Sequence, residues 1–182
     1  LKADIKLANK SKKINVAIFG FGRIGRNIFR LAFNDPRFNI VAISEFGPAE
    51  ALHYLLARDS VHGKLNEPIE LDGNQLVIGD QRVTILPGAT PGMIPWSTMD
   101  VDFVIDATGA YLERNELDKH IQAGAKRVIV SRTPDDRIDR MIIHGINEES
   151  VEGSDKIISA TSSTSTHIAS NKSATKDTTQ KH

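Results

Sequence analysis

The chain has 182 residues, of which 40% are hydrophobic and 25% are charged, a composition that excludes collagen-like, disordered and disulfide-rich miniprotein classes. Its 23 basic and 23 acidic residues cancel, so the overall charge favours neither nucleic acid nor an anionic membrane as a partner. The absence of cysteine excludes disulfides and thiolate chemistry, and it fits a reducing compartment such as the cytoplasm. The six histidines are scattered and make no metal-ligand spacing, so we expect no metal site.

The predicted elements begin with a strand, a helix and a second strand. Residues 13–19 form a short apolar run that is typical of a buried strand. Residues 26–33 have helical periodicity, with Ile28, Leu31 and Ala32 on one side, and residues 39–44 are a second buried strand. This order predicts a βαβ unit.

Farther along, residues 49–57 predict a helix. Residues 67–86 alternate between polar and apolar and contain two turn signals, at 72–74 and 79–80, which indicates small antiparallel strands. A buried strand at 101–106, a helix at 113–123 and strands at 127–131, 141–144 and 156–159 follow.

Strands that alternate with helices predict an α/β fold, a doubly wound, mostly parallel Rossmann sheet with a small antiparallel insertion. We assign this domain to residues 13–160. Residues 1–12 form a basic N-terminal arm. Residues 161–182 are rich in Ser and Thr and offer little to bury, so we expect a disordered tail there.

Three glycines after the first strand, Gly20, Gly22 and Gly25, make the G-x-G-x-x-G pattern of dinucleotide-binding loops. The first allows a tight turn, the second lets a pyrophosphate approach the backbone, and the third lets helix and strand pack closely. The helix start offers free N–H groups to the phosphates. A glycine turn without a ligand is the alternative.

A carboxylate follows the second strand, at Glu45. A carboxylate there suits the two hydroxyls of an adenosine ribose and repels a 2′-phosphate, so we expect NAD rather than NADP as the cofactor. Thr108, Gly109 and Ser131 follow two later strands and belong to the same sheet edge. The alternative for Glu45 is a surface carboxylate at a strand end, and the alternative for the other three is a plain strand-to-helix turn.

These motifs, together with Asp59-Ser60-Val61-His62-Gly63 and Gly145-Ile146-Asn147, resemble the glyceraldehyde-3-phosphate dehydrogenase family over residues 13–170, its NAD-binding half. The resemblance implies an oxidoreductase of glycolysis that acts on a phosphorylated aldehyde, with an oligomer possible. It places Arg23 and Ile24 at the pyrophosphate and adenosine, and Thr108, Gly109 and Ser131 near the adenine and nicotinamide. We also count Phe21, between the first two glycines, among the cofactor-binding residues. It also places Tyr111 beside the adenine.

Two positions depart from the family pattern. Phe19 stands where the family usually has Asn, which removes a polar group beside the pyrophosphate. Ser163 stands where the family has its nucleophilic Cys, and a serine hydroxyl needs a positioned base. We therefore expect a chain that binds NAD and turns over little aldehyde. A non-catalytic NAD-binding module and a truncated or frame-shifted product are the alternatives.

Overall fold

The computed structural model describes residues 12–59, 63–65 and 67–160. Its helices are α1 (Arg23–Ala32), α2 (Ala49–Ala57) and α3 (Arg114–Gln122), with short 3-10 helices at Trp96–Met99 and Glu148–Ser150. Its main sheet contains β1 (Ile14–Phe19), β2 (Phe38–Glu45), β5 (Ile69–Asp72), β6 (Gln75–Ile78), β7 (Gln81–Pro87), β8 (Phe103–Asp106), β9 (Arg127–Val130), β10 (Arg140–Ile142) and β11 (Ile157–Ala160). A separate ribbon pairs β3 (Arg58–Asp59) with β4 (Gly63–Lys64).

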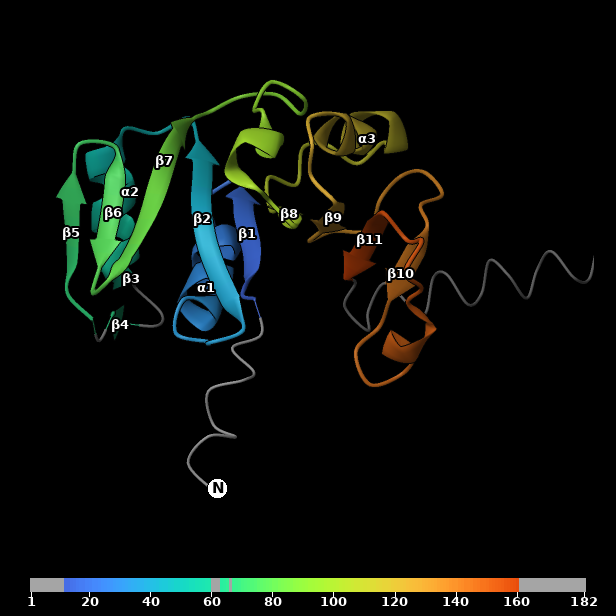
Figure 1. Ribbon diagram of the computed structural model, residues 1–182, viewed down its shortest axis with the longest axis horizontal. Helices are drawn as coiled ribbons and strands as arrows, with labels where there is room; N and C mark the ends of the chain where they lie inside the picture. Colours follow the sequence, from blue (N-terminus) through green and yellow to red (C-terminus); the bar gives the residue numbers. More distant parts are fainter. Residues whose placement is uncertain (1–11, 60–62, 66, 161–182) are drawn as a thin grey trace, which may run out of the picture.

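The strand order of the main sheet is β10-β11-β9-β8-β1-β2-β7-β6-β5 (Figure 1). The pairs from β10 through β7 are parallel, whereas β5, β6 and β7 pair antiparallel. The chain runs from β1 to β2 in one direction and later returns to β8 on the other side of β1. This reversal is the topological switch of a doubly wound sheet, so the predicted fold class is confirmed.

β7 belongs to two parts of the sheet at once. It pairs antiparallel with β6, as the turn signals predict, and parallel with β2 along Ala42–Thr84 to Glu45–Pro87. The predicted antiparallel insertion is therefore continuous with the parallel sheet. Consequently the carboxyl end of β7 lies at the same sheet edge as those of β1 and β2.

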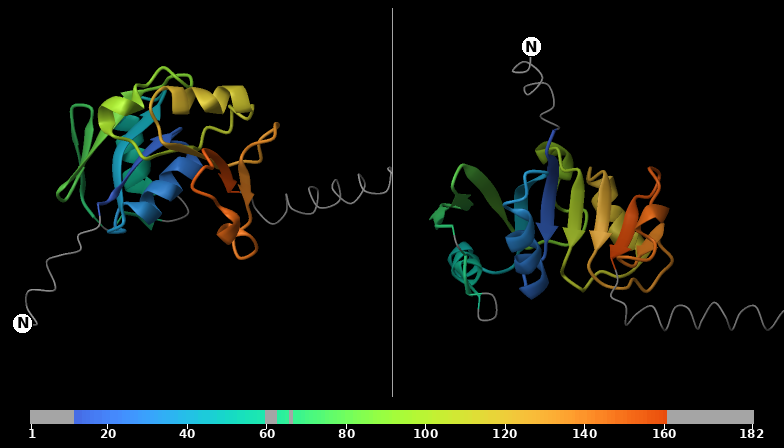
Figure 2. Two further views of the ribbon diagram at one scale, coloured as in Figure 1. Left: turned by 45° about the vertical axis from the view of Figure 1, so that its right-hand side comes forward. Right: turned by 90° about the horizontal axis from the view of Figure 1, so that it is seen from below.

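The helices cover opposite faces of the sheet, with α1 and α2 on one face and α3 on the other (Figure 2). Side chains alternate along β1, so Ile18 packs with Phe29 of α1, whereas Phe19 packs on the opposite face with Trp96. A third cluster joins α3 to β9 and β11 through Leu117, Val128 and Ile157.

Helix α1 begins three residues earlier than predicted, and its core side also differs. Phe29 is fully buried, whereas Leu31 is 82% exposed. The prediction for Leu31 is wrong, because α1 packs on the sheet through Gly25 and Phe29, which turns Leu31 outward.

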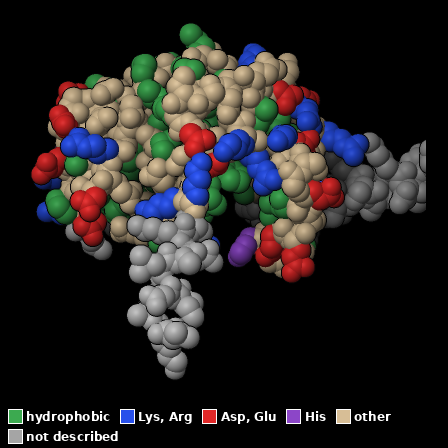
Figure 3. Space-filling model, in the orientation of Figure 1, with side chains coloured by type: hydrophobic (Ala, Val, Ile, Leu, Met, Phe, Trp, Pro, Cys, Tyr) green, Lys and Arg blue, Asp and Glu red, His purple; other side chains and the backbone are tan. Residues whose placement is uncertain are grey.

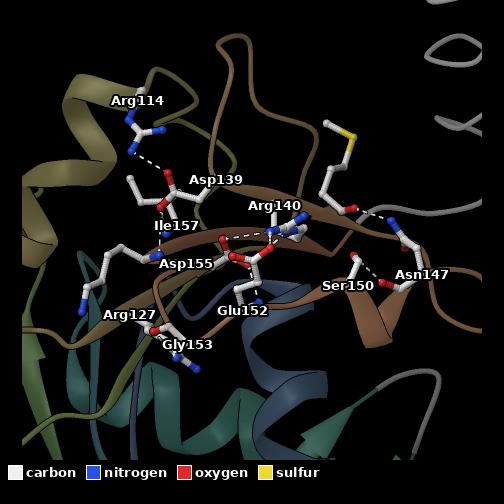
Figure 4. Close-up of polar contacts among 12 residues, drawn as sticks. Arg114, Arg127, Asp139, Arg140, Asn147, Ser150, Glu152, Gly153, Asp155 and Ile157 are labelled. Carbon is white, nitrogen blue, oxygen red and sulfur yellow. Dashed lines mark hydrogen bonds and ion pairs between the residues drawn. The ribbon is translucent and has the colours of Figure 1, made fainter.

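Ion pairs hold the β10–β11 edge of the sheet (Figure 4). Arg140 Nε lies 2.9 Å from the buried Asp155 carboxylate, and Arg114 Nη2 lies 2.7 Å from Asp139. Asp139 also accepts hydrogen bonds from the amides of Lys156 and Ile157. Burial raises the pKa of Asp139, but the two amides and Arg114 outweigh it and hold this pKa below its usual value.

Residues 1–11 and 161–182 lie outside the described residues, as do 60–62 and 66. Most of the predicted arm, the predicted tail, Ser163 and His62 are therefore not placed. The domain boundaries stay predictions. None of the helices in the described ranges combines the length and the apolar character that a membrane crossing requires.

Candidate cofactor site

The turn after β1 requires glycine at two positions. Gly20 has φ +91°, and a Cβ there would lie 2.7 Å from the backbone nitrogen of Thr108. At Gly25, a Cβ would collide with the carbonyl oxygen of Gly20. The first glycine therefore lets the turn approach the segment after β8, and the third lets α1 pack on the turn.

Gly22 differs from these two, because a Cβ built there meets no atom within 4 Å in the described part of the chain. Gly22 is the N-cap of α1, and its carbonyl accepts the first helical hydrogen bond, from the amide of Arg26, at 3.0 Å. The first amides of a helix lack partners within the helix. The described residues put neither a capping side chain nor an acidic residue in this first turn. The space beside Gly22 thus suits an anion.

Glu45 lies at the end of β2, with its carboxylate held by two backbone amides. Oε2 accepts a hydrogen bond from the Phe21 amide at 2.7 Å, and Oε1 accepts one from Phe46 at 2.8 Å. Each carboxylate oxygen can accept more than one hydrogen bond, so the group retains capacity for ligand hydroxyls.

A pocket of about 270 Å³ opens at the carboxyl ends of β1, β2, β7 and β8. It is lined by Phe19, Gly20, Gly22, Ser44, Glu45, Phe46, Gly88, Ala89, Ala107, Thr108, Ala110 and Tyr111. The fold thus brings together four of the predicted cofactor-binding residues, namely Gly20, Gly22, Glu45 and Thr108. Tyr111, which the resemblance places beside the adenine, also lies there.

The other predicted residues surround this pocket without lining it. Arg23 and Ile24 lie exposed in the first turn of α1, and Gly25 is buried beneath them. The ring of Phe21 is buried against Phe29, with 5.6 Å between centroids, so only the backbone of Phe21 faces the site. The side chain of Phe21 therefore belongs to the hydrophobic core.

Gly109 and Ser131 lie on the β8–β9 side of the pocket. Gly109 has φ +67°, and its carbonyl oxygen accepts a hydrogen bond from Arg132 at 3.1 Å. The amide of Ser131 donates to the carbonyl of Asp106 at 3.0 Å, which extends the β8–β9 pairing. Both residues share the sheet edge of the pocket, as predicted, but they stand outside its lining.

Sequence reasoning missed several lining residues, among them Ser44, Phe46, Gly88, Ala89 and Ala110. Ser44 precedes Glu45 and donates a hydrogen bond from its hydroxyl to Pro87, and the exposed ring of Phe46 packs over Gly88. Gly88 and Ala89 follow the carboxyl end of β7, and the parallel pairing of β7 with β2 was not predicted. A parallel reading of β7 would have placed residues 87–89 at this edge.

The opposite edge of the sheet carries a groove with a different character. Basic side chains gather at the amino ends of the strands (Figure 3), where Lys12, Lys13, Lys126, Arg127 and Lys156 line the groove. Lys12 and Lys126 pair with the acidic neighbours Asp100 and Asp102. These basic residues are scattered in the sequence, and the fold collects them and partly neutralises them.

The described residues contain no group of three or more His, Cys, Asp or Glu side chains that could hold a metal ion. The groups in and beside the pocket instead suit a ligand that carries phosphates and hydroxyls. A glycine-lined space beside free helix amides suits a pyrophosphate, and a fixed carboxylate beside it suits a ribose diol.

Comparison with known proteins agrees with this geometry. The family model described as "Glyceraldehyde 3-phosphate dehydrogenase, NAD binding domain" matches residues 14–114, which contain β1, α1, β2, β8 and all of the pocket lining. The chain belongs to this family. The cofactor of this domain is therefore NAD.

Individual relatives extend the similarity beyond residue 114. Glyceraldehyde-3-phosphate dehydrogenase 1 of Bacillus subtilis is 37% identical over 154 residues, which are 85% of this chain and 46% of the relative. The Mycoplasma pneumoniae enzyme is 36% identical over 160 residues, 88% of this chain and 48% of the relative. The Geobacillus stearothermophilus enzyme is 38% identical over 136 residues, which are 75% of this chain and 40% of the relative. The chain thus spans about half the length of the curated relatives it matches.

Proposed function

We propose that this chain holds NAD across the carboxyl ends of β1, β2 and β8, with the pyrophosphate over Gly22 and the adenosine ribose at Glu45. The observation that carries this assignment is the open space at Gly22 beside the start of α1, with the Glu45 carboxylate lining the same pocket. Glycine admits the phosphates to the backbone, and the carboxylate accepts from the ribose hydroxyls.

The remaining predicted residues take supporting roles in this proposal. Gly20 and Gly25 shape the turn, and the amides of Arg23 and Ile24 face the phosphates. The Phe21 amide positions Glu45. Thr108 lines the same pocket as Glu45. Gly109 and Ser131, on the β8–β9 side, would lie near the adenine and nicotinamide.

Glu45 also makes the site prefer NAD over NADP. Its carboxylate is held by two amides, so it cannot swing away from a 2′-phosphate without losing both hydrogen bonds. Titration calorimetry of the native chain is expected to show tighter binding of NAD than of NADP, and Glu45→Ala is expected to narrow the difference. Glu50→Ala, at an exposed position in α2, is the matched control. Equal affinity of the native chain for the two cofactors contradicts the role of Glu45.

For the whole protein we propose the reaction that its relatives' names state, the oxidation of glyceraldehyde 3-phosphate, as a cytoplasmic step of glycolysis. NAD, when bound, supplies the hydride acceptor. The chain's own contribution is to bind and orient that cofactor. The support is the family membership together with a pocket whose parts fit NAD.

Tested as it stands, the 182-residue chain is expected to turn over little or no aldehyde. It contains no cysteine, and Ser163 occupies the position that the resemblance gives to the nucleophile. A thiol ionises far more readily than a serine hydroxyl, which needs a positioned base. The assay follows NADH absorbance with glyceraldehyde 3-phosphate and phosphate for the native chain and for Ser163→Cys. Robust turnover by the native chain contradicts this expectation.

The absence of cysteine favours a second candidate, a non-catalytic NAD-binding regulatory or interaction module. Restoring the thiol alone, by Ser163→Cys, is expected to rescue little in either case, because the thiol also needs a base that activates it. The assay with NAD, phosphate and glyceraldehyde 3-phosphate separates the two candidates. Aldehyde oxidation favours the dehydrogenase, whereas NAD binding without oxidation favours the binding module.

A further inference from the structure

A polar pair lies behind the pocket wall and has no role in the proposed function so far. Asp106 ends β8 and is 1% exposed, and His120 lies on α3 and is fully buried. Carboxylates and imidazoles are rarely buried without partners, because removing them from water costs free energy. The pair therefore needs an explanation.

One oxygen of Asp106 shapes the segment that lines the pocket. Asp106 Oδ1 accepts hydrogen bonds from the Thr108 amide at 3.0 Å and from the Thr108 hydroxyl at 2.6 Å. The Thr108 hydroxyl in turn accepts from the amide of Ala110 at 3.1 Å. Its only hydrogen is thus committed to Asp106, so Asp106 sets both the rotamer of Thr108 and the course of the turn.

The other oxygen of Asp106 faces His120. Oδ2 lies 3.6 Å from His120 Nε2, and neither atom has a hydrogen-bond partner within the described residues. His120 Nδ1 lies 3.1 Å from Trp96 Nε1, which can only donate. Nδ1 is therefore an acceptor, so the ring hydrogen of the neutral imidazole is on Nε2 and points toward Asp106.

We propose that Asp106 and His120 are positioning residues for NAD, which hold the Thr108 turn against the cofactor through a chain from Trp96 to His120 to Asp106 to Thr108. This inference rests on the proposed function. Thr108 packs so closely on Gly20 that only glycine fits there. A shift of the Thr108 turn therefore moves one wall of the pocket and disturbs the glycine turn that holds the pyrophosphate.

The first test compares two replacements of His120. His120→Gln keeps an acceptor for Trp96 and an N–H group on the side of Asp106. His120→Phe keeps a ring beside Phe19 but loses the hydrogen bond from Trp96 and the 3.6 Å polar contact with Asp106. By analogy with residues that orient the ligands of a bound metal, the NAD dissociation constant is expected to rise about tenfold in His120→Phe. His120→Gln is expected to restore most of the affinity.

Asp155→Asn is the matched control. Asp155 is buried, as Asp106 and His120 are, but it pairs with Arg140 at the β10–β11 edge, away from the pocket (Figure 4). It is expected to lower the melting temperature and to leave the NAD dissociation constant unchanged. Loss of NAD affinity in this control would mean that general destabilisation explains the His120 result, and it would overturn the inference.

A double-mutant cycle of His120→Phe and Thr108→Val separates a positioning role from a merely structural one. Thr108 is exposed, so Thr108→Val still tests the inference if His120→Phe does not fold. Thr108→Val alone is expected to raise the dissociation constant severalfold. The double variant is expected to bind about as weakly as His120→Phe alone, because both changes break one chain of contacts. Unchanged affinity in Thr108→Val, or multiplied effects in the double variant, overturns the inference. If the native chain itself does not bind NAD, the proposed function fails instead.

Discussion

At the scale of single residues, the three glycines of the turn do different work, and substitution distinguishes them. Gly22 has φ −68° and open space around it, so a side chain is tolerated by the fold but blocks the pyrophosphate. Gly22→Val is expected to fold with a native circular dichroism spectrum and to lose NAD binding. Native-like NAD affinity in folded Gly22→Val would contradict the assignment of this space.

Gly25→Ala is expected to show the opposite behaviour. Its methyl group would collide with the Gly20 carbonyl, which is backbone and cannot rotate away. The cost appears in stability, as a lower urea midpoint or a failure to fold, measured by circular dichroism. An unchanged midpoint would mean that α1 can move off the turn, against the close packing described above.

Phe19 illustrates how a departure from the family pattern is accommodated. Its ring is buried and packs edge-on to His120, with 4.7 Å between centroids, and lies near Trp96 and Tyr111. Phe19→Ala is expected to lower the free energy of unfolding by about 3 to 5 kcal/mol, as for other buried aromatic residues. Chemical denaturation measures the change, and a loss below about 1 kcal/mol would show that this cluster contributes little.

At the scale of elements, the position of a side chain around α1 decides its importance. Phe29 is fully buried, whereas Leu31 is 82% exposed. Phe29→Ala is expected to lower the free energy of unfolding by about 3 to 5 kcal/mol. Leu31→Ala is expected to change it by no more than about 0.5 kcal/mol. Comparable losses in the two variants would indicate that Leu31 is covered in solution.

The elements also show what the sequence can and cannot predict. The glycine pattern after an apolar strand predicts the βαβ unit and the chain turn, because the positive φ of Gly20 and the contact of Gly25 with the Gly20 carbonyl are local. The outward position of Leu31 depends on how α1 rotates against the sheet, which its periodicity alone does not determine. The lining residues Gly88 and Ala89 depend on the parallel pairing of β7 with β2, a contact distant in sequence.

At the scale of the whole molecule, stability depends on pH through paired carboxylates. Arg140 beside Asp155, together with the Glu152 amide, holds the pKa of the Asp155 carboxyl below its usual value. Folding lowers the pKa of this carboxyl, so the carboxylate stabilises the folded protein at pH values above the unfolded pKa, which is about 3.9 for Asp. This contribution is lost as the pH falls through the lower pKa of the folded state.

The melting temperature is therefore expected to fall as the pH decreases below about 4. Asp155→Asn is expected to melt lower at neutral pH and to lose less on acidification, because part of the acid-sensitive contribution is already gone. Differential scanning calorimetry between acid and neutral pH measures both curves. If the melting temperature falls equally steeply below about pH 4 in the native chain and in Asp155→Asn, the contribution of Asp155 is contradicted.

The central claim is that NAD lies in the pocket at the carboxyl ends of β1, β2, β7 and β8. An NMR titration of the ¹⁵N-labelled chain with NAD tests it most directly, because each backbone amide reports its own surroundings. We predict that the largest shifts occur at Gly20, Gly22, Glu45 and Thr108, with little change at Arg140 and Asp155. Shifts centred on the β10–β11 edge or on the basic groove, or no shifts at saturating NAD, would contradict the account.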